Sequence, residues 1–320
     1  MSYLKGFNTV FETTLNNELQ DNLIEFFDWG LLEKGNYFNT TKGETSNAGT
    51  DYSKLTLSKS QSFASGRAWE GFRKNWIWQS GIEPSGMTAP IVGTDHANPG
   101  ISGVYVDDTF YATSGEGTYA HYIDYFNGRV VFDSAIPTTS NVQVEHSYKY
   151  INVIYANSLP WLREIQYRSL DVNSSTNSDF TLPAEIKVQL PAIAVEVVPR
   201  RTFRGYQLGG GQYVRTDVLF HCIAEDEMTR NKLVDIVSFQ NDKVFALFDN
   251  DTLASSGAFP LDYKGVPVSG ALRYPDIVND YNSGKDAMFT NSVVQGMELI
   301  NSRFYAGIVR STLETINTNI

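Results

Sequence analysis

Cysteine and histidine are almost absent from this chain, whose 320 residues include one cysteine and four histidines. The single cysteine, Cys222, excludes an intramolecular disulfide and any zinc site that is built from several thiolates. Cys222 directly follows His221 in the strand-like stretch YVRTDVLFHCIA. Because successive side chains of a strand point to opposite faces, this pair cannot act as a nucleophile and its base.

The common short catalytic and phosphate-binding motifs are missing as well. G-x-S-x-G, H-E-x-x-H and G-x-x-x-x-G-K-[ST] do not occur. The one glycine cluster, residues 209–211, precedes a predicted strand, whereas phosphate-binding loops lead into a helix, so we expect a flexible or interface-adapting loop. Asp95 and His96 have no matching ligand spacing elsewhere, and we interpret them as part of a solvated loop. We therefore expect no catalytic residue, no cofactor and no metal site, while a glycosidase stays open because it needs only two of the 36 acidic residues.

Basic residues are outnumbered: 25 Lys and Arg stand against 36 Asp and Glu, a formal net charge of −11. Proteins that bind nucleic acid by neutralising phosphates need a clustered excess of Lys and Arg, so the composition disfavours that class. No apolar run approaches the roughly 20 residues that cross a bilayer, and the first residues lack an uninterrupted apolar segment. We therefore expect synthesis in the cytoplasm and no association with a membrane.

The first segment, residues 1–79, opens with the pattern of an amphipathic helix. Thr14 is a suitable N-cap, and the apolar residues that follow recur at helical spacing, which predicts a helix that ends at Gly30. Residues 35–54 are rich in Gly, Asn, Thr and Ser. They predict a long exposed loop that leads into a short strand.

Three of the five tryptophans lie close together in this segment, at Trp69, Trp76 and Trp78, near the basic residues Arg67, Arg73 and Lys74. One interpretation is an aromatic platform for sugars or single-stranded nucleic acid. We favour a subunit contact or the edge of a core, because tryptophan and arginine are enriched at interfaces and the acidic composition disfavours a polyanion.

The second segment, residues 80–157, consists of short strand patterns separated by turn signals. VYVDDTFYAT predicts two strands joined by a turn at Asp107 and Asp108. IDYFNGRVVFD predicts a hairpin with a two-residue type I′ turn at Asn127 and Gly128. The alternating stretch VQVEHSYKYINVIYA predicts a further strand. Strands at this spacing indicate a small β-sandwich or barrel, which we expect to fold independently as an inserted module.

The third segment, residues 158–320, mixes both kinds of pattern. Strand-like runs occur at residues 193–198, 213–224 and 302–316, and the acidic start of EDEMTRNKLVDIVSFQ is typical of a helix N-terminus. This order predicts an α+β fold in which helices cover one face of a sheet.

The sequence LPAIAVEVVPRRTFRGYQLGGGQYVRTDVLFHCIAEDEMTRNKLVDIV, followed by the strand-like KVFALFD, resembles tail-terminator and tail-completion (neck) proteins of tailed bacteriophages. The resemblance covers about half of the chain and implies a terminator-like sheet in residues 158–320. It further implies a non-enzymatic virion protein that forms a ring, usually a hexamer, at the head-proximal end or neck of the tail. The implied partners are copies of itself and other neck, tail-tube and sheath proteins, with DNA passing through an acidic bore without sequence-specific binding. The β-rich segment is similar to small modules inserted in phage virion proteins.

Arg200, Arg201 and Arg204 lie in the loop predicted before the glycine cluster. We predict that they dock onto an acidic face of a neighbouring subunit or ring, because arginine pairs with carboxylates in a bidentate manner. A solvated cationic loop is the alternative. The three tryptophans complete the candidate interface. The alternative function is a baseplate or adhesion module that binds host-surface carbohydrate through the tryptophans and the β-rich segment.

Overall fold

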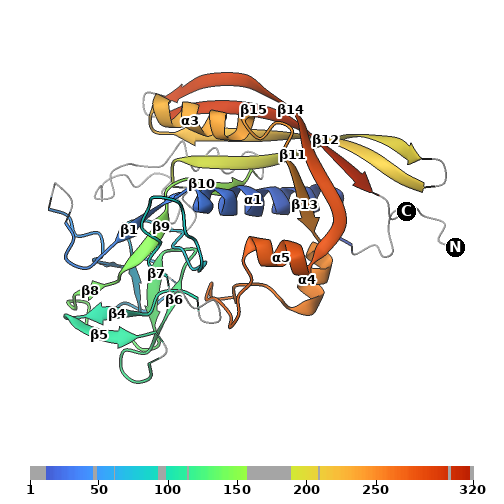
Figure 1. Ribbon diagram of the computed structural model, residues 1–320. Coiled ribbons are helices and arrows are strands. Elements are labelled where there is room, and N and C mark those ends of the chain that lie inside the picture. The colour runs from blue at the N-terminus through green and yellow to red at the C-terminus, as the bar shows by residue number, and fades with distance from the viewer. Residues whose placement is uncertain are drawn as a thin grey trace.

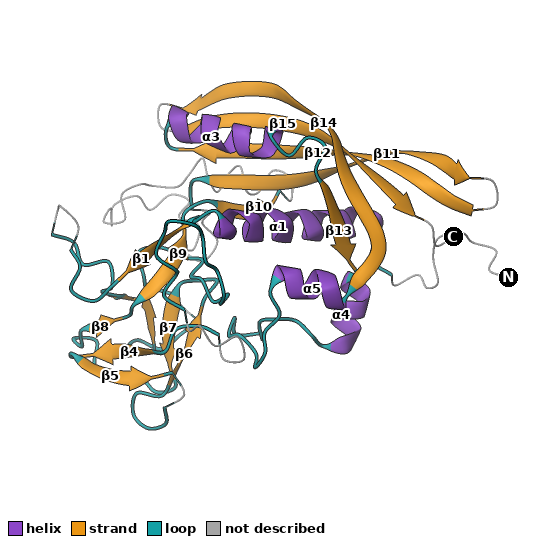
Figure 2. Cartoon of the chain, viewed as in Figure 1, coloured by secondary structure: helices purple, strands orange, loops and turns teal. Residues whose placement is uncertain are grey.

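A computed structural model describes residues 12–45, 49–60, 62–92, 99–113, 115–156, 189–207, 210–301 and 304–317. Within these residues the fold is mixed α+β and mostly sheet, with four helices and a curled six-stranded sheet (Figures 1 and 2). The predicted α+β class is confirmed. None of the described helices is both long and apolar enough to cross a bilayer.

The six-stranded sheet is built mainly from long antiparallel strands. Its order is β10-β11-β12-β15-β14-β13, and only β10 and β11 run parallel. The strands span Asn152–Tyr155 (β10), Ala192–Gln207 (β11), Gly210–Ala224 (β12), Phe304–Asn317 (β15), Asn282–Asn301 (β14) and Val244–Phe248 (β13).

Two helices, α1 (Leu15–Glu33) and α3 (Glu227–Ser238), share one hydrophobic core with this sheet. The ring of Phe27 in α1 meets the ring of Phe220 in β12 at a centroid distance of 5.2 Å. Leu233 of α3 is fully buried in the same cluster. Because a fully buried leucine or phenylalanine side chain contributes about 1.5–3 kcal/mol, this cluster accounts for much of the stability of the sheet. We refer to the six-stranded sheet with its helices as the large-sheet region.

Helix α1 begins where the sequence predicts but ends later. Thr14 caps the helix by accepting a hydrogen bond from the backbone N–H of Asn17 at 3.5 Å. The predicted end at Gly30 is wrong, because Leu31 and Leu32 are buried and extend the apolar face by another turn. The chain leaves the helix only at Gly35, whose φ of +80° lies in the left-handed region that favours glycine.

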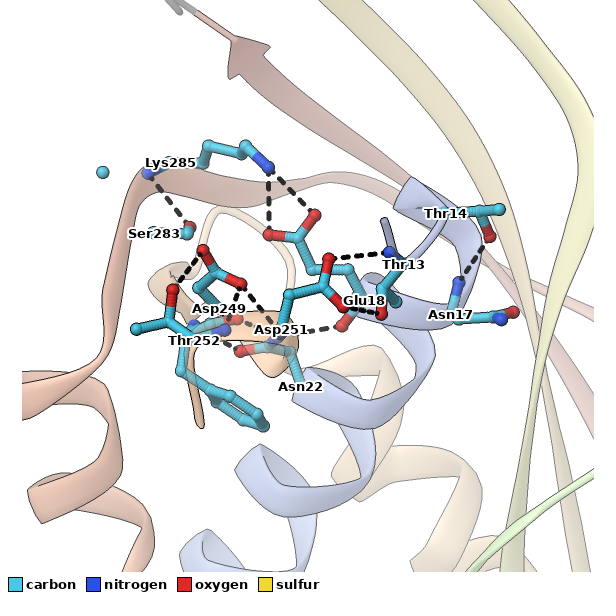
Figure 3. Close-up of polar contacts among 12 residues, drawn as sticks. Thr13, Thr14, Asn17, Glu18, Asn22, Asp249, Asp251, Thr252, Ser283 and Lys285 are labelled. Atoms are coloured by element: carbon cyan, nitrogen blue, oxygen red, sulfur yellow. Dashed lines mark hydrogen bonds and ion pairs between the residues drawn. The ribbon is translucent and has the colours of Figure 1, made fainter. Parts of the chain in front are cut away.

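Polar contacts fix the start of α1 against two distant segments (Figure 3). Asp251 accepts hydrogen bonds from the backbone N–H and the hydroxyl of Thr13, at 2.7 and 2.6 Å. Lys285 at the start of β14 donates to both carboxylate oxygens of Glu18, at 3.0 and 3.1 Å. The amide of Asn22, which is fully buried, exchanges two hydrogen bonds with the backbone of β13. Such directional contacts set the position of α1 along the sheet, which apolar packing alone does not.

Three small sheets form a second part of the molecule, the small-sheet region (residues 36–151), below the large sheet in Figure 1. Their orders are β1-β9, β2-β3-β7-β6 and β5-β4-β8. The strands span Tyr37–Thr40 (β1), Thr56–Leu57 (β2), Ala68–Glu70 (β3), Gly103–Val106 (β4), Thr109–Ala112 (β5), His121–Asp124 (β6), Arg129–Phe132 (β7), Val142–Gln143 (β8) and His146–Lys149 (β9). The stretch predicted as one strand before Ala156 is therefore divided into β8, β9 and β10.

Strand pairing in this region crosses the boundary expected between the first two segments. β3 pairs with β7, and β1 pairs with β9, so residues before and after position 80 share sheets. β1 also lies inside the stretch predicted to be an exposed loop. The division into three domains stays a prediction. A fragment that begins at residue 80 would lack β1 and β3, which pair with β9 and β7.

The two predicted hairpins form, with one correction. Asp107 and Asp108 connect β4 and β5 with φ values of 48° and 67°, the pair of positive angles that a type I′ turn requires. Between β6 and β7, however, the last pair is Asp124 with Arg129, so the loop has four residues and the predicted two-residue turn is wrong. Asp124 causes the longer loop, because its carboxylate accepts from the backbone N–H of Asn127 and from Arg129.

Two short helices complete the described chain. α4 spans Asn250–Ser256 and α5 spans Tyr274–Asp280, both between β13 and β14. The connection between these helices passes beside the small-sheet region, where the backbone N–H of Tyr125 donates to the carbonyl of Gly265 at 3.5 Å. Residues between α4 and α5, far from the small-sheet region in the sequence, thereby contribute to its surface.

Candidate assembly interface

The distal part of the β11–β12 hairpin forms an arm, which we define as residues 200–216 (Figure 1). β15 pairs with the β12 strand of the arm as far as Gln212, and the end of the hairpin extends beyond that pair. The register between the two strands shifts between Val197 and Arg201, which marks a β-bulge at the base of the arm. β-Bulges bend a strand and increase its twist. The bulge therefore changes the direction of the arm relative to the body of the sheet.

Arg200, Arg201 and Arg204 lie in this arm and not in a loop, so their predicted setting is wrong. The strand continues through them because β12 offers hydrogen-bonding partners as far as Gln212. Arg200 and Arg204 are exposed, whereas Arg201 is half-buried opposite the buried Thr216, and desolvation lowers the pKa of its guanidinium. No carboxylate of the described residues forms an ion pair with any of the three arginines.

Aromatic side chains accompany these arginines on the arm. Phe203 and Tyr206 are both exposed. Since side chains alternate along a strand, Phe203 shares a face with Arg201, while Tyr206 shares the opposite face with Arg204. Each face of the arm thus offers an arginine next to an aromatic ring, which is the side-chain pairing that is enriched at protein interfaces.

Other charged residues on the same strands are already paired within the chain. Arg215 contacts Glu314 at 2.6 Å, and Arg310 forms an ion pair with Asp217. These pairs link β12 to β15. Arg200, Arg201 and Arg204 differ from Arg215, the fourth arginine of the arm, in lacking an ion-paired carboxylate among the described residues.

The sheet also has two edges that no described strand covers. β10 pairs with β11 only as far as Val195, so the outer edge of β11 has no partner strand beyond that residue. β13 pairs with β14 only up to Met288, and the other edge is likewise open further along β14. Exposed apolar side chains lie along this second stretch: Val293, Val294, Met297 and Leu299. Unpaired edges of this kind are templates for the addition of another strand.

The tryptophans predicted for the interface are buried instead. Trp69, Trp76 and Trp78 are 4%, 1% and 8% exposed and lie in the core of the small-sheet region. The indole N–H of Trp76 donates to the carbonyl of Arg73 at 2.9 Å, so the polar end of the ring is satisfied inside. Their burial agrees with the core-edge interpretation and removes them from any surface that a sugar could reach on this chain.

Two potentially reactive side chains, His146 and Cys222, are buried. His146 stacks on Trp76 with ring centroids 4.2 Å apart, and burial lowers its pKa to about 4. Cys222 is fully buried, and burial raises the pKa of its thiol to about 12, which makes it a poor nucleophile at neutral pH. Within the described residues, no group of three or more His, Cys, Asp and Glu side chains is placed to hold a metal ion. Asp95, His96 and Gly209 lie outside the described residues.

Comparison with protein families, with curated protein sequences and with solved structures finds no match to this chain. Its functional features therefore have to be judged from its own geometry. Sequence reasoning selected the arginines from their clustering, but it missed the open edge of β14. The run of apolar residues at its exposed end is the signal that could have indicated that edge.

Proposed function

We propose that the protein is a non-enzymatic structural subunit that assembles with copies of itself into a closed ring through its arm and the open edges of its large sheet. The observation that carries the proposal is the arm, in which three of the four arginines, Arg200, Arg201 and Arg204, have no ion pair with a described carboxylate and lie beside two exposed aromatic rings. The exposed rings of Phe203 and Tyr206 leave apolar surface in water in a single chain, and a contact with another chain would bury it.

Charge complementarity supports a second copy of the chain as the partner. The arm concentrates arginine in a protein whose formal net charge is −11. The rest of the chain therefore carries an excess of carboxylates, and another copy offers such groups for bidentate binding by guanidinium. Repulsion between the acidic bodies would disfavour other orientations of the two copies.

The position of the two open edges supports a ring. The outer edges of β11 and β14 lie at opposite sides of the same sheet. A contact between β11 of one copy and β14 of the next joins different surfaces of the two copies, and repetition of such a head-to-tail contact produces a closed ring when the rotation closes. Addition of a strand across these edges would supply backbone hydrogen bonds, and the apolar residues of β14 would be covered.

The resemblance of residues 190–237 to phage tail-terminator and neck proteins supports a location of this ring at the head-proximal end or neck of a phage tail. On this proposal the ring is a hexamer that contacts tail-tube, sheath and neck proteins. DNA would pass its acidic bore without being held, because carboxylates repel phosphates. The rival proposal, a carbohydrate-binding adhesion module, loses the tryptophan platform on which it was based.

Negative-stain images of the purified protein and of assembled particles test the proposal. We expect rings with a central hole, and we expect the triple variant Arg200→Glu, Arg201→Glu, Arg204→Glu to abolish them while its circular dichroism stays unchanged. The matched control is Lys54→Glu, Lys232→Glu, Lys243→Glu, which changes the charge equally at three exposed lysines outside the arm and should leave rings intact. A wild-type protein that stays monomeric at micromolar concentration and forms no ring in particles would contradict the proposal.

A further inference from the structure

A pocket of about 400 Å³ opens on the small-sheet region, away from the arm. Three segments that are distant in the sequence meet there: the loop around Phe63, the β6–β7 hairpin, and the turn at residues 262–265 that approaches from the connection between α4 and α5. The four aromatic residues of its lining are Phe63, Tyr122, Phe126 and Tyr263.

Two of these rings are largely exposed. Phe126 is 65% exposed and Tyr263 is 92% exposed, although both line the same pocket. Each such ring leaves a large apolar surface in water, and neither contributes to a described core cluster. Aromatic rings held around a hollow with a few polar groups are the usual lining of a small-molecule site.

The polar groups of the pocket are held in place by their neighbours. Asp124 is only 5% exposed, and its carboxylate accepts from the side-chain amide of Asn127 at 2.8 Å and from Nε of Arg129 at 2.9 Å. Arg129 in turn stacks over the ring of Phe63 at 4.7 Å. Its position is therefore fixed by a carboxylate on one side and an aromatic face on the other.

Lys264 adds a second cation that the carboxylate of Asp124 does not balance. Its Nζ lies 5.0 Å from the centre of the Tyr122 ring and 5.7 Å from that of the Tyr263 ring. Among the described residues it has no ion-pair partner. The lining residues thus include one carboxylate and two cations, in a chain that is otherwise acidic. Asp262 in the same turn is not a lining residue, and its carboxylate accepts from the backbone N–H groups of Lys264 and Val266.

We propose that this pocket binds a hexuronic acid unit of a polysaccharide. A pyranose ring presents a face of C–H groups that packs on aromatic rings, and a rim of hydroxyl groups that hydrogen-bond to carboxylate, amide and guanidinium groups. The carboxylate of the sugar would lie against Lys264, which supplies the unbalanced positive charge. Oδ1 of Asp124 accepts one described side-chain or turn hydrogen bond, from the backbone of Asn127, and has capacity for a sugar hydroxyl.

The lining also defines what the pocket does with such a unit. Glycoside hydrolysis needs two carboxyl groups on either side of the scissile bond. Asp124 is the one carboxylate among the lining residues of the described pocket. The pocket therefore binds the sugar and does not cleave it, and this binding is independent of ring assembly.

Calorimetric titration of the full chain with tri-galacturonic acid, its methyl ester and adenosine monophosphate tests the assignment. We expect binding of the acid, and binding of the neutral ester at least tenfold weaker. Tyr263→Ala should weaken binding of the acid at least tenfold, whereas Phe239→Ala, which removes an equally exposed ring elsewhere, should have no effect. Lys264→Gln should weaken binding of the acid while leaving the ester unchanged, which a merely structural lysine would not do.

Three results would overturn the proposal. These are the absence of binding to the acid, equal binding of the acid and the ester, and tighter binding of the nucleotide than of the sugar. Circular dichroism of the variants establishes that they are folded, which is expected because all three altered side chains are exposed. Repeating the titration with the triple arginine variant separates this site from assembly, since an unassembled chain should bind the sugar equally well.

Discussion

The large-sheet region and the small-sheet region solve the problem of burying apolar residues in different ways. The former uses strands such as β11, β12, β14 and β15, which are 16, 15, 20 and 14 residues long, around a core dominated by aliphatic residues and phenylalanine. The latter uses strands of 2 to 4 residues that enclose tryptophans. The long strands continue past the core that they cover, so their ends form the arm and the unpaired edges. Short strands are joined by many turns, so a pocket forms where turns meet.

This difference assigns the two proposals to different parts of the chain. Backbone hydrogen-bonding groups at an open edge favour another copy of the protein, and they belong to the large-sheet region. Side chains gathered by turns favour a small ligand, and they belong to the small-sheet region. Experiments that separate the two regions therefore test both proposals.

The largest expected effect on stability comes from removing one large buried side chain from the core of each region. Phe220→Ala in the large-sheet region and Trp76→Ala in the small-sheet region remove side chains that are 0% and 1% exposed, and each should cost about 3–5 kcal/mol. We expect both to lower the same calorimetric transition, because a buried cluster with Trp29 and Leu32 joins α1 to the small-sheet region. Two separate transitions, each moved by one substitution only, would show that the regions unfold independently, as the sequence predicts for residues 80–157.

A half-buried acid on α1, Glu25, provides the next largest effect. Burial raises the pKa of Glu25 to about 7, and the neighbouring carboxylate of Asp28 adds to the rise, while Lys149 opposes it. The unfolded chain releases this proton near the ordinary pKa of 4.5, so the folded state holds more protons between pH 4.5 and pH 7. The free energy of unfolding should therefore fall by about 3 kcal/mol as the pH rises through this window.

Glu25→Gln removes this dependence, because glutamine stays neutral. Urea denaturation at pH 8 should show the variant to be more stable than wild type by up to about 3 kcal/mol, with no difference near pH 4.5. His146 in the small-sheet region serves as the opposite case: its lowered pKa of about 4 means that stability is lost on acidification below pH 6.5. Equal stability of wild type and Glu25→Gln at pH 8 would show that Glu25 ionises normally.

Local periodicity predicted much of the large-sheet region and little of its functional surface. The strand predicted at residues 213–224 coincides closely with β12, and its alternating residues Val214, Val218, Phe220 and Cys222 are all buried. β14 escaped notice because its register with β15 shifts three times, and each shift disrupts the two-residue period by which a strand is recognised.

The pocket was beyond prediction for a different reason. Phe63, Tyr122 and Tyr263 come from segments with no common pattern, and only the fold brings them together. The tryptophans show the opposite case. They are clustered in the sequence, which suggested a surface site, but they are buried in the core. In the arm, the glycine and arginine content suggested a loop, whereas pairing with β12 keeps the segment extended.

A smaller effect is expected at the loop between β6 and β7. Gly128 has a φ of +62°, and a Cβ atom there would lie 2.4 Å from the carbonyl oxygen of Arg73, which is backbone. Gly257, at the end of α4, has a similar φ of +66° but open space around it. Both Gly→Ala variants carry the left-handed cost of about 1–2 kcal/mol, and Gly128→Ala should lose about 1–2 kcal/mol more through the collision. Thermal unfolding measures the difference, and equal losses would mean that the loop shifts freely.

The smallest expected effect has the opposite sign and can be compared between the regions. Asp108 in the β4–β5 turn and Asp242 before β13 both have positive φ, at 67° and 64°. Replacing either by glycine relieves the left-handed conformation, and we expect a gain of about 0.5–1 kcal/mol at each site. Asp108 also forms an exposed ion pair with Lys42, whose loss costs little. Asp108→Ala is the matched control, because it removes the ion pair without relieving the backbone and should be slightly destabilising. If Asp108→Gly and Asp108→Ala lose the same free energy in chemical denaturation, the ion pair and not the turn conformation governs this site.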